Sequence, residues 1–196
     1  MKTKLLMTVT VFVSMITATA QAGGFGVYGS YWSPADVDPG YGGGVKLTTD
    51  LTPELGFELR GSYFPDLSED LSTPVGTVDT DLEVMAAEAG LRVAIPLQDA
   101  SVRPYVGAGG GYYFMEVENE GINGVGEDTV DVDDELGWYL LGGLEVGLSD
   151  TLALFAEAQY RNFEATAQGD DLDEIDGEVE IDMDGIGANA GFAVTW

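Results

Sequence analysis

The sequence predicts an all-β protein that folds as one eight-stranded antiparallel up-and-down transmembrane β-barrel over residues 23–196. Three observations predict this fold. Apolar residues alternate with small or polar ones over most of the chain beyond residue 24, which is the period of a β-strand. Short turns alternate with longer connections. Beyond the N-terminal segment, no run of about 18 apolar residues could span a membrane as a helix, so any span must consist of strands.

Residues 1–22 have the pattern of a signal peptide. Lys2 and Lys4 give a positive start, residues 5–17 are apolar and uncharged, and Ala20-Gln21-Ala22 is a small-x-small cleavage pattern. The apolar run is too short to cross about 30 Å of hydrocarbon as a helix, which argues against a membrane anchor. We therefore expect export, cleavage after Ala22 and a single mature domain over residues 23–196.

The alternation divides the mature chain into eight predicted strands. The sixth is the clearest, with Leu140 and Leu144 on one face and Gly143 and Glu145 on the other. The first is ambiguous, because it carries aromatic residues on both faces. The predicted strands cover residues 24–33, 40–49, 54–64, 81–95, 102–117, 135–148, 152–164 and 182–196.

Short and long connections alternate between these strands. The short ones, built from common turn residues such as Asp, Pro and Ser, are residues 50–53, 96–101 and 149–151. The longer ones, rich in glycine and acidic residues, are residues 34–39, 65–80, 118–134 and 165–181. This alternation is typical of an outer-membrane barrel with both termini in the periplasm and its longer loops outside.

The two faces of the strands differ in composition, and the difference predicts which face meets lipid. One face carries bulky aliphatic and aromatic residues. The other is largely glycine, including Gly56, Gly90, Gly107, Gly109, Gly111, Gly137, Gly143, Gly147 and Gly187. The water-exposed surface of a soluble lipocalin-like carrier would carry Lys, Glu, Ser and Thr instead. Because eight strands leave just enough interior for side chains, glycines let large neighbours fit inside, so we expect the apolar face to point outward.

All five basic residues of the mature chain lie on the glycine-bearing face, together with four glutamates. A basic side chain facing lipid at the midplane costs about 2–4 kcal/mol, whereas one inside the barrel can pair with a carboxylate. The predicted lumenal charge network consists of Lys46, Glu58, Arg60, Glu88, Arg92, Arg103, Glu145, Glu157 and Arg161. Two interpretations stay open: the network fills and rigidifies a closed lumen, or it forms a narrow ion path whose salt bridges exchange partners.

Aromatic residues near the strand ends fit the two interfacial girdles of a membrane barrel, where amphipathic rings lie at headgroup level. The residues assigned to these girdles are Tyr31, Tyr63, Phe64, Tyr112, Phe114, Trp138, Tyr160, Phe192 and Trp196. A role in stacking against a ligand has no support in the sequence.

The composition excludes several functional classes. The formal net charge is −28, or −30 without the two lysines of the signal peptide, so no basic patch exists to bind nucleic acid. The chain has no cysteine and no histidine, which excludes disulfides, thiolate chemistry and Ser–His hydrolysis. No pair stands out among 35 acidic residues, so we expect neither an enzyme nor a cofactor.

Acidic residues gather in the longer connections. Glu180, Asp182, Asp184 and Gly185 match half of an EF-hand loop, but the twelfth position would be Gly191 rather than Glu. We therefore expect a solvated anionic surface with diffusely associated divalent cations, and no specific metal site.

The signal peptide, the eight alternating segments and the terminal residues GFAVTW together resemble the small outer-membrane β-barrel family that includes the OmpA-type membrane domain. The likeness covers essentially all of residues 23–196, and it implies the bacterial outer membrane, with its lipid and lipopolysaccharide as surroundings. In that family the barrel-assembly machinery reads a last strand that ends on an aromatic residue. Phe192, Val194 and Trp196 match this assembly signal, with Trp where Phe is usual.

The resemblance says little about activity, because this fold hosts adhesins, narrow pores, enzymes and structural proteins. The leading hypothesis is an integral outer-membrane protein with a structural or surface-interaction role in the envelope and acidic extracellular loops. The alternative is a narrow, cation-preferring channel with a salt-bridge-gated lumen.

Overall fold

The computed structural model describes residues 23–35, 37–73, 76–97, 101–118, 131–132, 134–168 and 179–196. The expected signal peptide and most of the last two long connections lie outside these ranges. The described chain is mostly strand. It contains no helix with the length and apolar character needed to cross a membrane.

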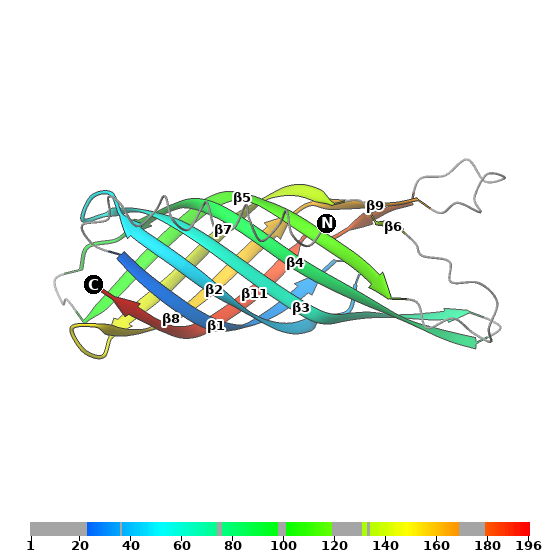
Figure 1. The fold of residues 1–196 in the computed structure, drawn as a ribbon, viewed down its shortest axis with the longest axis horizontal. Coiled ribbons are helices and arrows are strands. Elements are labelled where there is room, and N and C mark those ends of the chain that lie inside the picture. Colours follow the sequence, from blue (N-terminus) through cyan, green and yellow to red (C-terminus); the bar gives the residue numbers. More distant parts are fainter. Residues whose placement is uncertain are drawn as a thin grey trace, which may run out of the picture.

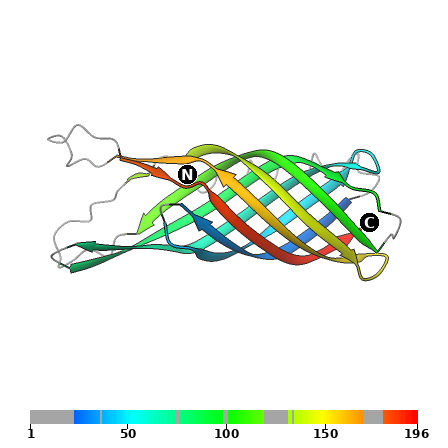
Figure 2. The ribbon, with the colours of Figure 1, turned by 180° about the vertical axis from the view of Figure 1, so that it is seen from behind.

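Eight strands form the barrel wall: β1 (Gly23–Pro34), β2 (Gly40–Asp50), β3 (Leu55–Thr73), β4 (Gly76–Ala94), β5 (Val102–Glu118), β7 (Glu135–Gly147), β8 (Leu152–Asn162) and β11 (Gly185–Thr195). They pair antiparallel in the closed order β1-β11-β8-β7-β5-β4-β3-β2, so each lies beside its neighbour along the chain and the last closes on the first. Figures 1 and 2 show the tilted wall from opposite sides. The predicted eight-stranded up-and-down barrel is confirmed.

The two ends of the barrel differ. At one end, named here the short-turn end, tight turns join β2 to β3 and β7 to β8, and Gly23 and Trp196 exchange two backbone hydrogen bonds of 3.2 and 3.1 Å. At the opposite end, the long-loop end, β3 and β4 continue together beyond the barrel wall (Figure 1). The backbone pairing of β3 and β4 runs out to Thr73 and Gly76.

Most of the expected loop at residues 65–80 is therefore paired strand, and the prediction of a loop there was wrong. The acidic composition of this segment suggested a loop, yet its Leu67 stands opposite Leu82 of the predicted strand at residues 81–95. The pairing shifts between Phe64 and Leu67, beside Pro65, which has no amide hydrogen to donate to a ladder.

A second, three-stranded sheet lies at the long-loop end. It contains β6 (Asp131–Val132), β9 (Glu164–Gln168) and β10 (Val179–Asp182) in the order β10-β9-β6. The last two predicted strands, 152–164 and 182–196, are thus each divided between the barrel and this sheet. At the division Phe163 and Met183 are both buried, and the Met183 amide donates to the Phe163 carbonyl at 3.2 Å.

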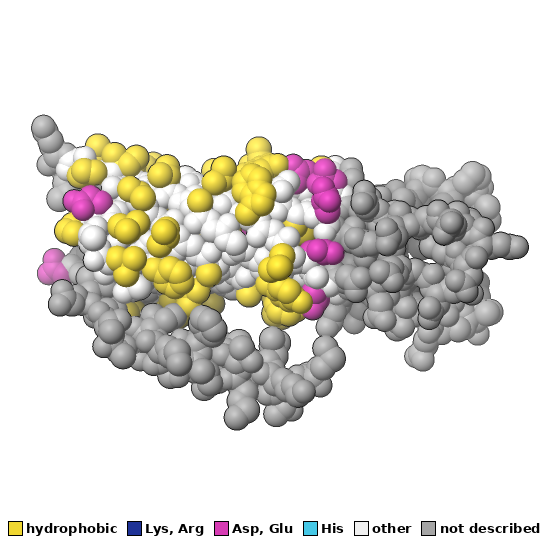
Figure 3. Space-filling view, turned by 90° about the horizontal axis from the view of Figure 1, so that it is seen from above, with side chains coloured by type: hydrophobic (Ala, Val, Ile, Leu, Met, Phe, Trp, Pro, Cys, Tyr) yellow, Lys and Arg dark blue, Asp and Glu magenta, His cyan; other side chains and the backbone are white. Residues whose placement is uncertain are grey.

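Side chains alternate between the outside and the interior as predicted. Leu140 is 50 % exposed and its neighbour Leu141 6 %, and the ambiguity in β1 is resolved with Tyr28 and Trp32 inside. Figure 3 shows hydrophobic side chains banding the barrel, with acidic side chains beyond them at the long-loop end. Eight of the nine predicted girdle aromatics have outward positions. Phe64 does not: it is fully buried inside, because its neighbour Tyr63 takes the outward position of the strand.

Glycines on the inner face make room for tyrosine rings. A Cβ atom added to Gly44 would lie 2.5 Å from the ring of Tyr28, and one added to Gly143 would lie 2.7 Å from the ring of Tyr105. By contrast, a Cβ on the outward-facing Gly142 would meet nothing within 4 Å. The glycine-rich face is therefore packed against large side chains, which leaves little free space along the barrel axis.

Candidate functional site

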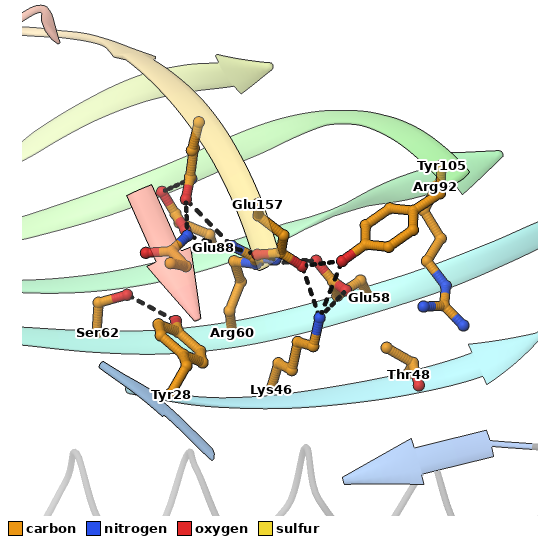
Figure 4. A network of polar contacts seen from close by, with 12 residues as sticks. Tyr28, Lys46, Thr48, Glu58, Arg60, Ser62, Glu88, Arg92, Tyr105 and Glu157 are labelled. Atoms are coloured by element: carbon orange, nitrogen blue, oxygen red, sulfur yellow. Dashed lines mark hydrogen bonds and ion pairs between the residues drawn. The ribbon is translucent and has the colours of Figure 1, made fainter. Parts of the chain in front are cut away.

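The centre of the lumen holds a cluster of ions drawn from opposite walls. β8 and β3 are four strands apart in either direction around the barrel, so they face each other across it. Arg60 on β3 reaches across to Glu157 on β8, with Nη2 2.7 Å from Oε2, and also contacts Glu58 at 2.7 Å. Lys46 Nζ donates to Glu157 Oε1 at 2.6 Å and lies 3.8 Å from Glu58 (Figure 4). These four side chains, named here the central ion cluster, are at most 2 % exposed.

A second buried pair lies toward the long-loop end. Arg161 Nε donates to Glu88 Oε1 at 2.9 Å, and neither side chain has any exposed surface. The same oxygen accepts from Tyr113 Oη at 3.1 Å and Gln159 Nε2 at 2.9 Å. Gln159 also accepts from Arg60 at 3.1 Å, so it joins this pair to the central ion cluster.

The remaining predicted charges lie at the short-turn end. Arg92 stands between Asp50 at 3.3 Å and Glu145 at 3.5 Å. Arg103 is 4.0 Å from Glu145, and its side chain is 43 % exposed. These residues line a pocket of about 250 Å³ that is open at this end. Arg103 therefore belongs to the mouth of the barrel and not to its buried interior.

The strand register explains why these charges meet. Lys46 stands opposite Arg60 in the β2–β3 pairing, and Arg60 stands opposite Glu88 in the β3–β4 pairing. Adjacent like charges are tolerated because carboxylates from other strands neutralise them: Glu157 accepts from both Lys46 and Arg60. The central ion cluster and the Arg161–Glu88 pair together hold three cations and three glutamates, a neutral set, as a low-dielectric site requires.

The structure places all nine residues of the predicted lumenal network on the inner face, and it adds partners that sequence reasoning missed. Tyr105 Oη donates to Glu157 at 2.5 Å, and Asn189 Nδ2 donates to Gln159 at 3.1 Å. These residues share the inward phase of their strands with the charged ones. Tyr105 and Asn189 could have been found as polar residues on the glycine-bearing face, but the prediction considered only charged residues.

An apolar cluster fills the lumen at the long-loop end. Its members are all buried: Trp32, Val37, Phe64, Leu67, Val84, Ala86, Tyr113, Met115, Phe163 and Met183. The rings of Tyr113 and Phe163 stack with centroids 3.9 Å apart. The interior thus changes from ionic at its centre to apolar at this end.

A groove on the outer face lies over β2 and β3 and is lined by Tyr41, Gly42, Gly43, Tyr63 and Pro65. The β2–β3 pairing ends at Gly43 and Tyr63, whereas β2 stays paired with β1 as far as Gly40. Directly behind the groove, a Cβ on Gly42 would lie only 2.7 Å from the ring of Phe64. Only backbone therefore separates this outward-facing groove from the apolar cluster inside.

The other sequence-predicted residues have simple surroundings. Phe192, Val194 and Trp196 all face outward and are at least 50 % exposed. In the partial EF-hand motif, Asp182 accepts from the Asp184 amide at 3.0 Å, which is a local turn contact. Within the part of the chain that the structure describes, no group of three or more His, Cys, Asp or Glu residues is arranged to hold a metal ion.

Comparisons with known proteins agree with this geometry. A family model described as outer membrane protein beta-barrel domain matches residues 5–195. The outer membrane protein OprG from Pseudomonas aeruginosa is similar in structure, with a TM-score of 0.77 at 16 % identity over 90 % of this chain and 96 % of that one. Neisserial surface protein A has a TM-score of 0.56 at 14 % identity, covering 89 % and 94 % of the two chains. The attachment invasion locus protein Ail of Yersinia pestis has a TM-score of 0.53 at 12 % identity, covering 91 % and 100 %. No curated protein sequence matches the chain.

Proposed function

The chain belongs to the outer membrane protein beta-barrel domain family, and from this premise we propose that it is a sealed structural barrel of the bacterial outer membrane whose acidic end makes contacts at the cell surface. The observation that carries the proposal is the contact of Arg60 with Glu157 across the lumen. A passing ion would have to separate this buried pair. An unpaired charge left in a buried site costs several kcal/mol, so the pair opposes a water-filled path.

The conductance of planar bilayers tests the sealed axis. We expect purified protein comprising residues 23–196 to insert without producing current steps, because the central ion cluster fills the cross-section. Insertion is checked independently by resistance of the folded protein to SDS and by its shift in gel mobility on boiling. Cation-selective current steps from inserted protein would contradict the sealed barrel and favour the gated channel, in which Lys46 would exchange Glu157 at 2.6 Å for Glu58 at 3.8 Å.

The acidic rim at the long-loop end supports the proposed surface contacts. Its members are Asp134, Glu164 and Asp182, which are exposed, and Asp184, which is half-buried. Tyr112 donates to Asp134 at 3.2 Å, and Tyr160 donates to Asp184. All five basic residues of the mature chain lie on the inner face, so none of them can contact lipopolysaccharide phosphates from the outer surface. We propose that divalent cations, diffusely held, bridge this rim to lipopolysaccharide.

Chelation tests this bridging. In vesicles that contain lipopolysaccharide and Mg²⁺, EDTA should lower the temperature at which the barrel loses its SDS resistance. In vesicles of zwitterionic phospholipid alone, EDTA should change nothing. The same shift in both vesicles, or in neither, would remove lipopolysaccharide bridging from the proposal. Recognition of Phe192, Val194 and Trp196 by the barrel-assembly machinery remains part of the proposal on the strength of their exposed, alternating positions.

The outer groove between β2 and β3, named here the β2–β3 seam, favours a second candidate function. This function is the lateral exchange of small apolar molecules between the membrane and the apolar cluster. The barrel wall is thin at this seam because Gly42 and Gly43, which line the groove beside Tyr41 and Tyr63, have no side chains. The chain has no cysteine of its own, so a disulfide between G43C and Y63C, which stand opposite each other, would lock the seam.

Locking the seam should slow the uptake of octane into vesicles that contain the oxidised variant, and reduction should restore it. The matched control is the cross-strand pair G142C and A158C in the β7–β8 seam, which also faces outward. Oxidation of that control should leave uptake unchanged. Equal uptake by vesicles with and without the protein would eliminate this second function.

A further inference from the structure

Three residues at the boundary between the ions and the apolar cluster carry polar atoms that the protein does not satisfy. Within the described residues, Arg161 Nη1 and Nη2, Glu88 Oε2 and Trp32 Nε1 are all buried without a hydrogen-bond partner. Arg161 and Glu88 are in direct contact through Nε and Oε1 at 2.9 Å. The guanidinium carbon of Arg161 lies 5.4 Å from the centroid of the Trp32 ring. Four of the five unsatisfied atoms therefore belong to three neighbouring side chains, and the fifth, Glu58 Oε2, lies in the central ion cluster.

Their surroundings isolate these atoms from bulk water. The side chains of Arg161 and Glu88 are completely buried, and so is Trp32. The ring of Phe64, a member of the apolar cluster, lies 5.5 Å from the Arg161 guanidinium carbon. Buried polar groups are nearly always hydrogen-bonded in folded proteins, and an orphaned group of a charged residue is among the costliest to leave. These neighbouring unsatisfied groups point to a ligand atom that pairs with several of them.

The inventory of unsatisfied groups selects the chemistry of that atom. Arg161 Nη1 and Nη2 and Trp32 Nε1 can only donate, whereas Glu88 Oε2 accepts. A carboxylate would satisfy the donors but would meet the charge of Glu88 and unbalance a neutral interior. An ammonium group would be repelled by Arg161. A hydroxyl oxygen accepts through two lone pairs and donates one proton, so it can serve two of the three donor nitrogens and Glu88 Oε2 without adding charge.

We propose that Arg161, Glu88 and Trp32 form a buried hydroxyl-binding site, in which the oxygen belongs either to water or to the end of an apolar alcohol. The apolar cluster beside the site matches the hydrocarbon part of such an alcohol in polarity. The site goes beyond the sealed barrel proposed above, because the seal depends on Arg60 and Glu157 and not on these three residues. If the barrel conducts ions, the proposal of a sealed barrel is wrong, but the hydroxyl-binding site is still tested separately by the tryptophan measurement below.

The indole N–H of Trp32 is the reporter for this site. With ¹⁵N-labelled tryptophan in lipid nanodiscs, the three indole resonances belong to Trp32, Trp138 and Trp196, and Trp32→Phe identifies the first. We expect one of two results for Trp32: a cross-relaxation signal to water, which identifies water as the occupant, or a saturable shift on adding octan-1-ol, which identifies an alcohol. Octane, which has no hydroxyl, should produce no saturable shift.

Two variants separate binding from general disturbance. Arg161→Lys keeps a cation for Glu88 but removes both free guanidinium nitrogens, so the water signal or the octanol shift should be lost or weakened at least tenfold. Arg92→Lys, a matched change at the opposite end of the lumen, should preserve it. If Arg161→Lys does not fold, the comparison of octanol with octane on the unaltered protein still decides. The site is refuted if Trp32 shows neither signal, if octane acts like octanol, or if folded Arg161→Lys behaves like the unaltered protein.

Discussion

Replacing Glu157 with Gln is expected to lower the free energy of unfolding by about 3–5 kcal/mol and to open the barrel to ions. Glu157 accepts from Lys46 at 2.6 Å, from Arg60 at 2.7 Å and from Tyr105 at 2.5 Å. The variant would leave two cations facing Glu58 alone in a site with almost no access to water. Urea titration in lipid vesicles, followed by tryptophan fluorescence, measures the first effect, and planar-bilayer conductance measures the second.

The control for this variant is Glu145→Gln. Glu145 makes only longer contacts with Arg92 and Arg103, at 3.5 and 4.0 Å, beside an open mouth. Without Glu145, Arg92 would keep its contact with Asp50 at 3.3 Å, and Arg103 is 43 % exposed to solvent. The loss of Glu145 should therefore cost about 0–1 kcal/mol, as for a solvated ion pair. A second substitution, Lys46→Met, should recover part of the stability of Glu157→Gln because it restores a neutral interior. Equal losses for Glu157→Gln and Glu145→Gln would contradict the central role of the cluster.

Much of the barrel could be predicted because the physics of a membrane strand is local. Each position must face lipid or the interior, so alternation alone assigns Leu140 to the outside and Arg60 to the inside. The same alternation predicts that the nine residues of the lumenal charge network lie on the inner face. Alternation does not predict which charged residues pair with each other, because the partners depend on the closed order of the strands. Arg60 contacts Glu157, which is 97 positions away, because the closed strand order places β3 and β8 on opposite sides of the barrel.

The errors lie where strict alternation fails. Phe64 and Leu67 are both buried inside although they are three positions apart, because the irregularity between them resets the phase of β3. A strict two-residue period puts Phe64 and Leu67 on opposite faces of the strand, so it cannot predict that both are buried. The loop predicted at residues 65–80 failed for a related reason: acidic content is a sign of solvent exposure, and a strand pair that extends beyond a membrane is also exposed to solvent.

The orientation of the wall leads to the second large effect. Leu140→Arg should lower the free energy of unfolding in vesicles by about 2–4 kcal/mol, because it places a cation on the lipid face near the middle of the barrel wall. Leu140 is 50 % exposed on the outer face and stands opposite Ala108 and Tyr160, in the central part of β7. Urea titration in vesicles provides the measurement.

Depth distinguishes this effect from a general intolerance of charge. Leu136 faces outward on the same strand but lies at the long-loop end, near the acidic rim, where an arginine can reach water and carboxylates. Leu136→Arg should therefore cost about 0–1 kcal/mol. In a soluble carrier with a wet exterior, both arginines would be solvated and both variants would be nearly as stable as the parent. A large loss at Leu140 with little loss at Leu136 requires an apolar medium around the middle of the barrel and an aqueous one at its rim, which only a membrane provides.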